Sequence, residues 1–540
     1  MSALPTPVAE WLRDAARTTR RRPPALIWVP AAGVAAVMLL PLLYLVLRSL
    51  EGGWSGAAEV LVAADTFATL GRSVLLAAVV TAASTAIAVP LAWLTARTDL
   101  PGRRLWAVLA ALPLVVPSYV GGFVLVSVLG PRGILQGALE PLGVERLPSI
   151  YGLFGAALAL TLFSYPYIFL TVRGAFRGMD PALEEAAKSL GSGGPKTFFR
   201  VILPQLRPAI VAGALLVALY TLSDFGAVSL LHYDSFAREI YIQYQSAFDR
   251  TPAAVLALML VALTATILLL ESRTRGRLRY HRGGAGAARR AVPVALGSWR
   301  WPALAFCGAV VSLALLAPVG ILSFWLARGL ASGEPLRLVW GAAWNSIYVS
   351  GLAAAVAALA ALPVAVLAVR FRGPVSGFVE RLTYLGYALP GIVLALALVF
   401  FGANYAPAFY GTLGALVVAY VIHFLPQAVG ATRAALLQIN PSVEEAARGL
   451  GRTPAGVLSS VTAPLARSGI LAGAALVFLT TMKELPATLL LSPIGFDTLA
   501  TSIWTATSEA FFARAAAPAL ILILVSAGPM YLLTIRERAK

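Results

Sequence analysis

Charged residues are scarce in this 540-residue chain, since only 12% of its residues are Asp, Glu, Lys or Arg. A soluble protein carries roughly 25% charged residues. Hydrophobic residues make up 59% of the chain, and many of them form long runs without a single charge. A soluble protein with a large buried helical core would lack the polar surface to cover these runs. The composition therefore indicates a polytopic membrane protein.

Cysteine and histidine are also rare. The single cysteine, Cys307, excludes a disulfide within the chain, an Fe–S cluster and a cysteine zinc site. The three histidines (His232, His281 and His423) are far apart in the sequence, which argues against a histidine-rich metal site. No Ser/His/Asp or paired-acid signature is present either. We therefore expect no catalytic residues, no bound cofactor and no stable metal site.

Because backbone groups cannot stay unpaired in lipid, the apolar runs must be helices or barrel strands. Their length and their lack of period-two alternation exclude a barrel. We predict an all-α polytopic membrane protein with twelve spans. The predicted spans lie near residues 26–48, 73–96, 105–130, 150–172, 206–230, 251–270, 301–327, 342–369, 382–402, 411–432, 466–490 and 515–535.

The net charge of +18 has a simple explanation in this topology. With the N-terminus inside, Lys and Arg concentrate in the loops of one face, which the positive-inside rule assigns to the cytoplasm. Both termini are then cytoplasmic. We read the basicity as a signal for orientation and for anionic headgroups of the lipid bilayer, and we expect no nucleic-acid partner.

The sequence also repeats itself. The segment Ser73–Arg97 aligns with Ser346–Arg370 at an offset of 273, and later segments align at an offset of 260. Each half holds six predicted spans, so the halves are parallel repeats with a pathway expected between them. The predicted domains are a basic N-terminal tail (1–24), a first membrane domain (25–271), a basic cytoplasmic linker (272–300) and a second membrane domain (301–540).

One charged octapeptide occurs in both halves, as "EEAAKSLG" from Glu184 and "EEAARGLG" from Glu444. Asp180 and Asn440 are good N-caps, each is followed by a proline suited to the first helical position, and a glycine ends each copy. Each copy is therefore predicted to be a short amphipathic cytoplasmic helix with an apolar stripe. A single copy would suggest a connector lying on its own bundle. Two copies favour a pair of docking helices for a twofold partner.

The pattern E-A-A-x-x-x-G, with a proline downstream, resembles the EAA loop of permease subunits of binding-protein-dependent ABC importers with the MetI-like fold. The resemblance implies that each helix docks on one of two ATPase subunits and that an extracytoplasmic binding protein delivers the substrate. In the second copy, Ala463 departs from the leucine that usually precedes the motif proline. The residues to which the resemblance assigns ATPase coupling are Glu184, Glu185, Ala186, Ala187, Gly191 and Pro204, and Glu444, Glu445, Ala446, Ala447, Gly451 and Pro464.

The chain is not expected to hydrolyse ATP itself. The nearest approach to a phosphate-binding loop is "GSGGPKT" (Gly191–Thr197). A Walker A motif needs glycine directly before its lysine, and here Pro195 takes that place and offers no N–H. ATP and Mg²⁺ are therefore expected on partner subunits, and this chain is not expected to be an enzyme.

Two acids interrupt the apolar sequence at equivalent positions. Asp224 and Glu484 are 260 residues apart, and each lies toward the predicted outer end of a span. Facing carboxylates could attract a hard cation, which prefers oxygen ligands. They could equally anchor helix ends, with Lys483 pairing an acid. Tyr220 and Thr481 add hydroxyl groups nearby, and with the acids and Lys483 they form the predicted substrate pathway.

The segments Asp224–Tyr244 and Lys483–Trp504 resemble the ferric-iron branch of these permeases, in which both halves are fused in one chain. That resemblance implies ferric iron as substrate. Related permeases carry thiamine, polyamines or phosphonates, so these stay open as alternatives. A secondary transporter driven by an ion gradient would also suit parallel repeats, but it has no need for two matched cytoplasmic helices.

Overall fold

The computed structural model describes residues 23–51, 53–131, 133–179, 182–246, 251–275, 293–333, 337–371, 373–384, 386 and 389–536. Within these residues every regular element is a helix, and the one β-bridge joins Thr98 to Val294. The predicted N-cap Asp180 and the following Pro181 lie outside the described residues. So do nearly all of the predicted N-terminal tail and residues 276–292 of the predicted linker.

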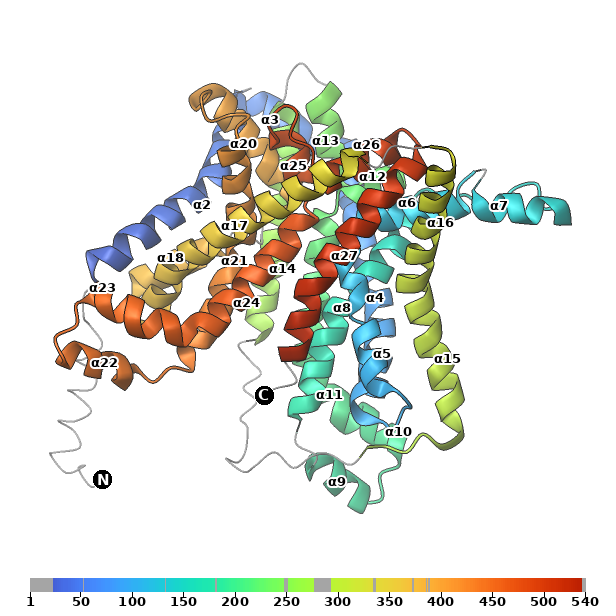
Figure 1. The fold of residues 1–540 in the computed structure, drawn as a ribbon, viewed down its shortest axis with the longest axis horizontal. Helices are drawn as coiled ribbons and strands as arrows, with labels where there is room; N and C mark the ends of the chain where they lie inside the picture. The colour runs from blue at the N-terminus through green and yellow to red at the C-terminus, as the bar shows by residue number, and fades with distance from the viewer. Residues whose placement is uncertain are drawn as a thin grey trace. The chain divides into compact units, whose positions relative to one another are not determined.

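The described residues of the first half form thirteen α-helices. These are α2 (Ala25–Glu51), α3 (Gly53–Val62), α4 (Ala64–Arg97), α5 (Arg103–Leu109), α6 (Ser118–Leu129), α7 (Ile134–Leu139), α8 (Leu153–Gly178), α9 (Ala182–Ser189), α10 (Gly194–Thr197), α11 (Leu203–Ser223), α12 (Gly226–Leu230), α13 (Phe236–Ser246) and α14 (Thr251–Arg275) (Figure 1). Short 3-10 helices at Leu112–Val115 and Glu140–Leu142 and a π-helical turn, η4 (Phe198–Ile202), join some of them.

The second half repeats this order. Its helices are α15 (Arg300–Val311), α16 (Ala317–Ala331), α17 (Arg337–Arg370), α18 (Pro374–Thr383), α20 (Gly391–Tyr405), α21 (Leu413–Leu437), α22 (Pro441–Gly449), α23 (Pro454–Val457), α24 (Ala463–Met482), α25 (Pro486–Leu491), α26 (Leu499–Ser508) and α27 (Phe512–Arg536). It also has a 3-10 helix at Gly297–Trp299 and π-helical turns η6 (Ser312–Leu316) and η7 (Leu458–Thr462).

The repeat predicted from sequence reappears in the helix boundaries. Helix α4 starts at 64 and ends at 97, and α17 starts at 337 and ends at 370, which is a shift of 273 at both ends. The π-helical turns η4 and η7 are shifted by 260 at both ends. The same sequence pattern therefore folds in the same way twice.

Eleven helical stretches in the described part of the chain are long and apolar enough to cross a membrane. The prediction of an all-α polytopic membrane protein is confirmed. The predicted ninth span is shorter than expected, because Pro390 caps the 15-residue helix α20 and separates it from α18. Its counterpart in the first half is divided in the same way, since Pro117 caps α6. Proline lacks the amide hydrogen that would continue a preceding helix.

The described chain forms two compact units that exchange segments between the halves. One unit consists of residues up to Leu47 together with Trp344–Phe496, and the other of Arg48–Ala343 together with the residues from Asp497 onward. Most of α2 therefore belongs with the second-half helices α20 and α21. Helices α16 and α27 belong with the first-half helices.

Equivalent glycines allow the central helices of each unit to pack closely. A Cβ atom on Gly213 of α11 would lie 2.7 Å from the Cα of Ile168 in α8. A Cβ on Gly473 of α24 would lie 2.9 Å from the Cα of Ala428 in α21. Small residues at such crossings let membrane helices approach each other. This close packing fixes α11 against α8 and α24 against α21. Candidate site residues lie near both ends of α11 and of α24.

Candidate functional site

The octapeptide copies form the short helices α9 and α22, as predicted. In Figure 1, α9 lies beyond the end of α11 within its unit. At the start of α22 the Asn440 side chain accepts a hydrogen bond from the Ser442 N–H at 3.1 Å, and Pro441 occupies the first helical position. These features confirm the predicted cap in the second copy.

Two residues beyond the end of each helix lies a glycine in the left-handed conformation, with φ of +79° at Gly191 and +83° at Gly451. The Ser192 N–H donates to the Ala187 carbonyl at 3.0 Å, and the Arg452 N–H donates to the Ala447 carbonyl at 3.1 Å. In each bond the donor is the residue that follows the glycine, and this pattern is the Schellman motif, which needs a left-handed residue before the donor. The glycines therefore stop both helices, as predicted.

The apolar side chains of these helices point away from their own bundle. Leu183 and Leu190 of the first copy are 58% and 86% exposed, and Val443 and Leu450 of the second are 45% and 87% exposed. Ala186 and Ala446 are exposed as well. A connector that lies on its own bundle would bury such a stripe. The two helices instead present exposed apolar side chains at equivalent positions.

The buried side of each helix carries a glutamate. Glu184 is 7% exposed and forms an ion pair with Arg97, the last residue of α4. Glu444 is 3% exposed, and its Oε2 lies 3.0 Å from Nε of Arg370, the last residue of α17. The sequence analysis placed both glutamates among the predicted ATPase-coupling residues. In the structure their side chains are buried against the bundle and do not lie on the exposed face of the helices. Their neighbours Glu185 and Glu445 are exposed.

The motif prolines follow π-helical turns. Pro204 comes two residues after η4, and Pro464 comes two residues after η7. The third π-helical turn, η6, is also followed two residues later by a proline, Pro318. A proline cannot donate to the carbonyl four residues earlier and clashes with it, and a locally widened helix relieves that clash. The prolines thus set the shape of the chain between α9 and α11 and between α22 and α24.

The two acids of the predicted pathway each cap a short helix in their own unit. Asp224 follows α11, and its Oδ1 accepts hydrogen bonds from the N–H groups of Ala227 at 3.0 Å and Val228 at 3.3 Å. Glu484 follows α24, and its Oε1 accepts from the Ala487 N–H at 3.3 Å. A carboxylate at a helix N-terminus satisfies free N–H groups and is favoured by the helix dipole.

The surroundings of the acids match their sizes. Ser118, at the start of α6, lies beside the shorter Asp224. The equivalent residue in the second half is Gly391, where a Cβ would lie 2.6 Å from Oε1 of Glu484. The longer acid thus occupies space that a side chain at position 391 would fill.

The other predicted pathway residues lie around these acids. The Tyr220 ring lies 5.7 Å from that of Tyr167. Thr481 is 3% exposed, and Lys483 directly precedes Glu484 at the end of α24. At the offset of 260, Tyr220 corresponds to Thr480, whose Oγ1 lies 3.3 Å from Oε1 of Gln427. The roles of these residues in a pathway stay predictions.

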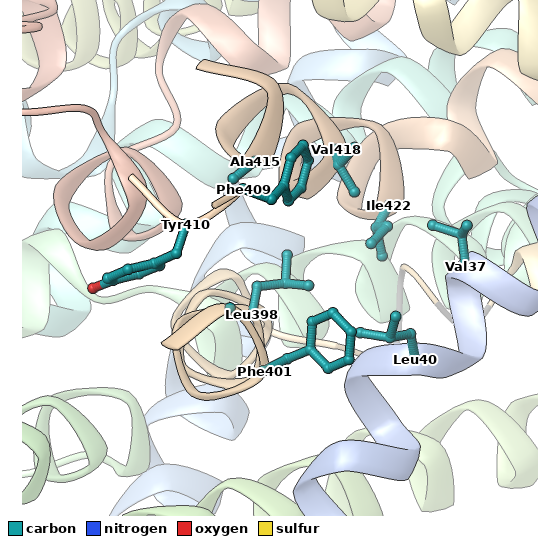
Figure 2. A pocket seen from close by; sticks show the side chains of 10 residues that line it. Val37, Leu40, Leu398, Phe401, Phe409, Tyr410, Ala415, Val418 and Ile422 are labelled. Carbon is teal, nitrogen blue, oxygen red and sulfur yellow. The ribbon is translucent and has the colours of Figure 1, made fainter. Parts of the chain in front are cut away.

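An apolar cavity lies among α2, α20 and α21 in the unit that contains Glu484. Figure 2 shows that its lining is hydrocarbon, including Val37, Leu40, Phe401 and Ile422, and that the hydroxyl of Tyr410 points away from its centre. Such a lining cannot replace the hydration shell of an ion. We therefore do not assign this cavity to a charged substrate.

The comparisons with known proteins decide the family. The model of the binding-protein-dependent transport system inner membrane component matches residues 88–279 and again residues 353–539. The chain belongs to this family. The repeat inferred from sequence thus corresponds to two copies of one permease domain in a multi-pass membrane protein.

Individual relatives agree with this assignment. The chain is 34% identical over 516 residues to the Fe(3+)-transport system permease protein FbpB 2 of Haemophilus influenzae. This alignment covers 95% of this chain and 98% of the relative. The chain is 27% identical over 406 residues to the ferric transport system permease protein FbpB of Actinobacillus pleuropneumoniae, covering 70% and 58%. It is 30% identical over 255 residues to the sulfate transport system permease protein CysT of Escherichia coli, covering 46% and 90%.

Sequence reasoning missed the two arginines that pair with the buried glutamates. Arg97 and Arg370 stand at the ends of the two aligned segments, so their recurrence at the offset of 273 was visible. What the sequence did not show is that they lie against the octapeptide helices, which are 87 and 74 residues away in sequence. Only the folded chain brings them together.

Proposed function

We propose that this permease is the membrane subunit of an ABC importer for ferric iron. Two copies of a separate ATPase subunit would dock on α9 and α22, and an extracytoplasmic binding protein would deliver the substrate to the opposite face. ATP and Mg²⁺ would be bound by the partner subunits.

The observation that carries the proposal is the repeated outward face of α9 and α22. An exposed leucine costs free energy in water unless a partner covers it, and Leu190 and Leu450 are each more than four-fifths exposed. Two equivalent faces suit a twofold partner. Iron as substrate is supported by the ferric permeases that match most of this chain.

The test is transport in proteoliposomes that contain the permease, the ATPase that copurifies with it and the matching binding protein. We expect ATP-dependent uptake of labelled Fe³⁺. Uptake of thiamine or sulfate in place of Fe³⁺ would contradict iron as substrate while leaving the importer intact. Uptake driven by an ion gradient without ATP would contradict the importer itself.

A further inference from the structure

The two buried ion pairs occupy the same place in both halves. Each joins the inward glutamate of a docking helix to the last residue of a membrane-length helix, as Arg97–Glu184 for α9 and α4 and Arg370–Glu444 for α22 and α17. The arginines recur at a shift of 273 and the glutamates at a shift of 260, so the pairing recurs although the spacing along the chain differs.

In the second half, a network surrounds the pair. The Thr462 hydroxyl donates to Oε1 of Glu444 at 3.0 Å, and the Arg370 guanidinium donates to the Ile439 carbonyl at 3.1 Å. Thr462 closes the π-helical turn η7, and Ile439 lies just before α22. The Arg370 guanidinium thus joins the end of α17 to α22 and to the segment that precedes α22. Glu444 also accepts a hydrogen bond from the π-helical turn that precedes α24.

In the first half, the interdomain linker takes part instead. Ile202 stands where the second half has Thr462, and it has no side-chain donor. Directly beside Arg97, the Val294 N–H donates to the Arg97 carbonyl at 2.8 Å and the Asp99 N–H donates to the Val294 carbonyl at 3.2 Å. The Leu296 N–H donates to Oδ1 of Asp99 at 2.9 Å. The end of α4 is therefore held by the docking helix and by the last part of the linker.

A buried pair of this kind is poor evidence for stability, because the cost of removing two charges from water offsets their attraction. Its directional bonds fix geometry instead, since the planar guanidinium offers donors in a rigid fork. Each arginine also lies at a helix C-terminus, where positive charge is favoured.

We propose that Arg97 and Arg370 are positioning residues that transmit the movement of the docking helices to α4 and α17. This inference rests on the proposed function. When an ATPase subunit displaces α9 or α22, the ion pair carries that displacement into the membrane-length helix, so ATP hydrolysis and transport stay coupled. Without the pair, the docking helix can move while the membrane helix stays behind.

The test uses the full chain reconstituted with its ATPase and binding protein. In the double variants Arg97→Gln/Glu184→Gln and Arg370→Gln/Glu444→Gln, both charges are removed and groups that can hydrogen-bond remain. We expect the ATPase to copurify and to hydrolyse ATP, while Fe³⁺ uptake per ATP hydrolysed falls by about tenfold. The variants Arg97→Lys and Arg370→Lys keep the charge without the fork, and we expect a smaller loss of coupling from them.

The matched control is Arg433→Gln/Glu380→Gln, which removes an ion pair between α21 and α18 in which Arg433 Nε lies 3.0 Å from Glu380 Oε1. We expect it to leave uptake per ATP unchanged. Wild-type uptake per ATP in the assembled Gln variants would overturn the inference. Failure of the two Gln double variants and the two Lys variants to bind the ATPase would also overturn it, because the pairs would then be purely structural. If the wild-type chain itself captures no ATPase, the proposed function fails, and this is seen before any variant is compared.

Discussion

At the scale of single residues, the left-handed glycines after α9 and α22, the proposed docking helices, are the most demanding positions. Apart from the adjoining chain, no atom of the described residues lies within 4 Å of a Cβ built on Gly191 or Gly451, so an added methyl group would meet no steric obstacle there. The cost comes from the backbone, since φ near +80° is unfavourable for residues with a side chain. Such a residue costs about 1–2 kcal/mol in this conformation.

We therefore expect Gly191→Ala and Gly451→Ala to disturb the ends of α9 and α22 without unfolding the membrane helices. Uptake per ATP hydrolysed should fall in both variants, and larger β-branched residues should lower it further. Gly137, which has a negative φ and open space around it, provides the control Gly137→Ala. Unchanged coupling in both variants would show that the shape of the helix ends is unimportant.

Asp224 and Glu484 offer a second test at this scale. An amide side chain keeps the oxygen that accepts the helix N–H groups but removes the negative charge. In Asp224→Asn/Glu484→Gln, the amide oxygens can still accept the N–H groups that begin α12 and α25. If the negative charge guides a cation, uptake of Fe³⁺ should fall while the ATPase still copurifies. Normal uptake in this double variant would return both acids to a purely structural role.

At the scale of elements, the exposed stripe of each docking helix makes a direct prediction. Leu190→Glu and Leu450→Glu place a charge on the outward face, and each side chain is almost fully exposed, so the fold should be unaffected. If these faces bind the ATPase, its copurification should fall by about tenfold or more. Val375→Glu, on α18 and 56% exposed, is the matched control. Equal loss with the control would point to a general effect of surface charge.

Sequence patterns predicted the helices and the repeat, but not the breaks within the spans or the buried ion pairs. The long charge-free runs, the caps around Asn440 and Gly451 and the repeat were enough to predict the helices, including the matched pair α9 and α22, because each depends on residues close in sequence. The division of the third span in each half at Pro117 and Pro390 was not foreseen, since an apolar run looks the same with or without a break. The Arg97–Glu184 and Arg370–Glu444 pairs join segments that are far apart in sequence. The spacing of apolar residues along the chain carries no information about which distant segments pack together.

At the scale of the whole molecule, the exchange of segments between the halves has a consequence for assembly. Tyr44 of α2 packs its ring 5.9 Å from that of Phe401 and 5.8 Å from that of Tyr405. The Asn404 amide donates to the Tyr44 hydroxyl at 3.1 Å. The second-half helices thus complete their unit with a helix from the start of the chain.

We expect residues 301–540 expressed alone to be unstable in the membrane, because α20 and α21 would lack their contacts with α2. Coexpression with residues 1–62, which contain α2 and α3, should raise their level, and the variant Tyr44→Ala in that fragment should reduce the rescue. Protease resistance of the isolated second half equal to that of the full chain would contradict this prediction.

If α9 and α22 both contact an external ATPase, photocrosslinking in native membranes detects these contacts directly. A photoreactive residue at position 185 or at position 445 should capture a nucleotide-hydrolysing subunit, whereas one at position 145, in a loop on the predicted outer face, should not. If neither docking position captures such a subunit while the full-length chain is present in the membrane, the account is contradicted.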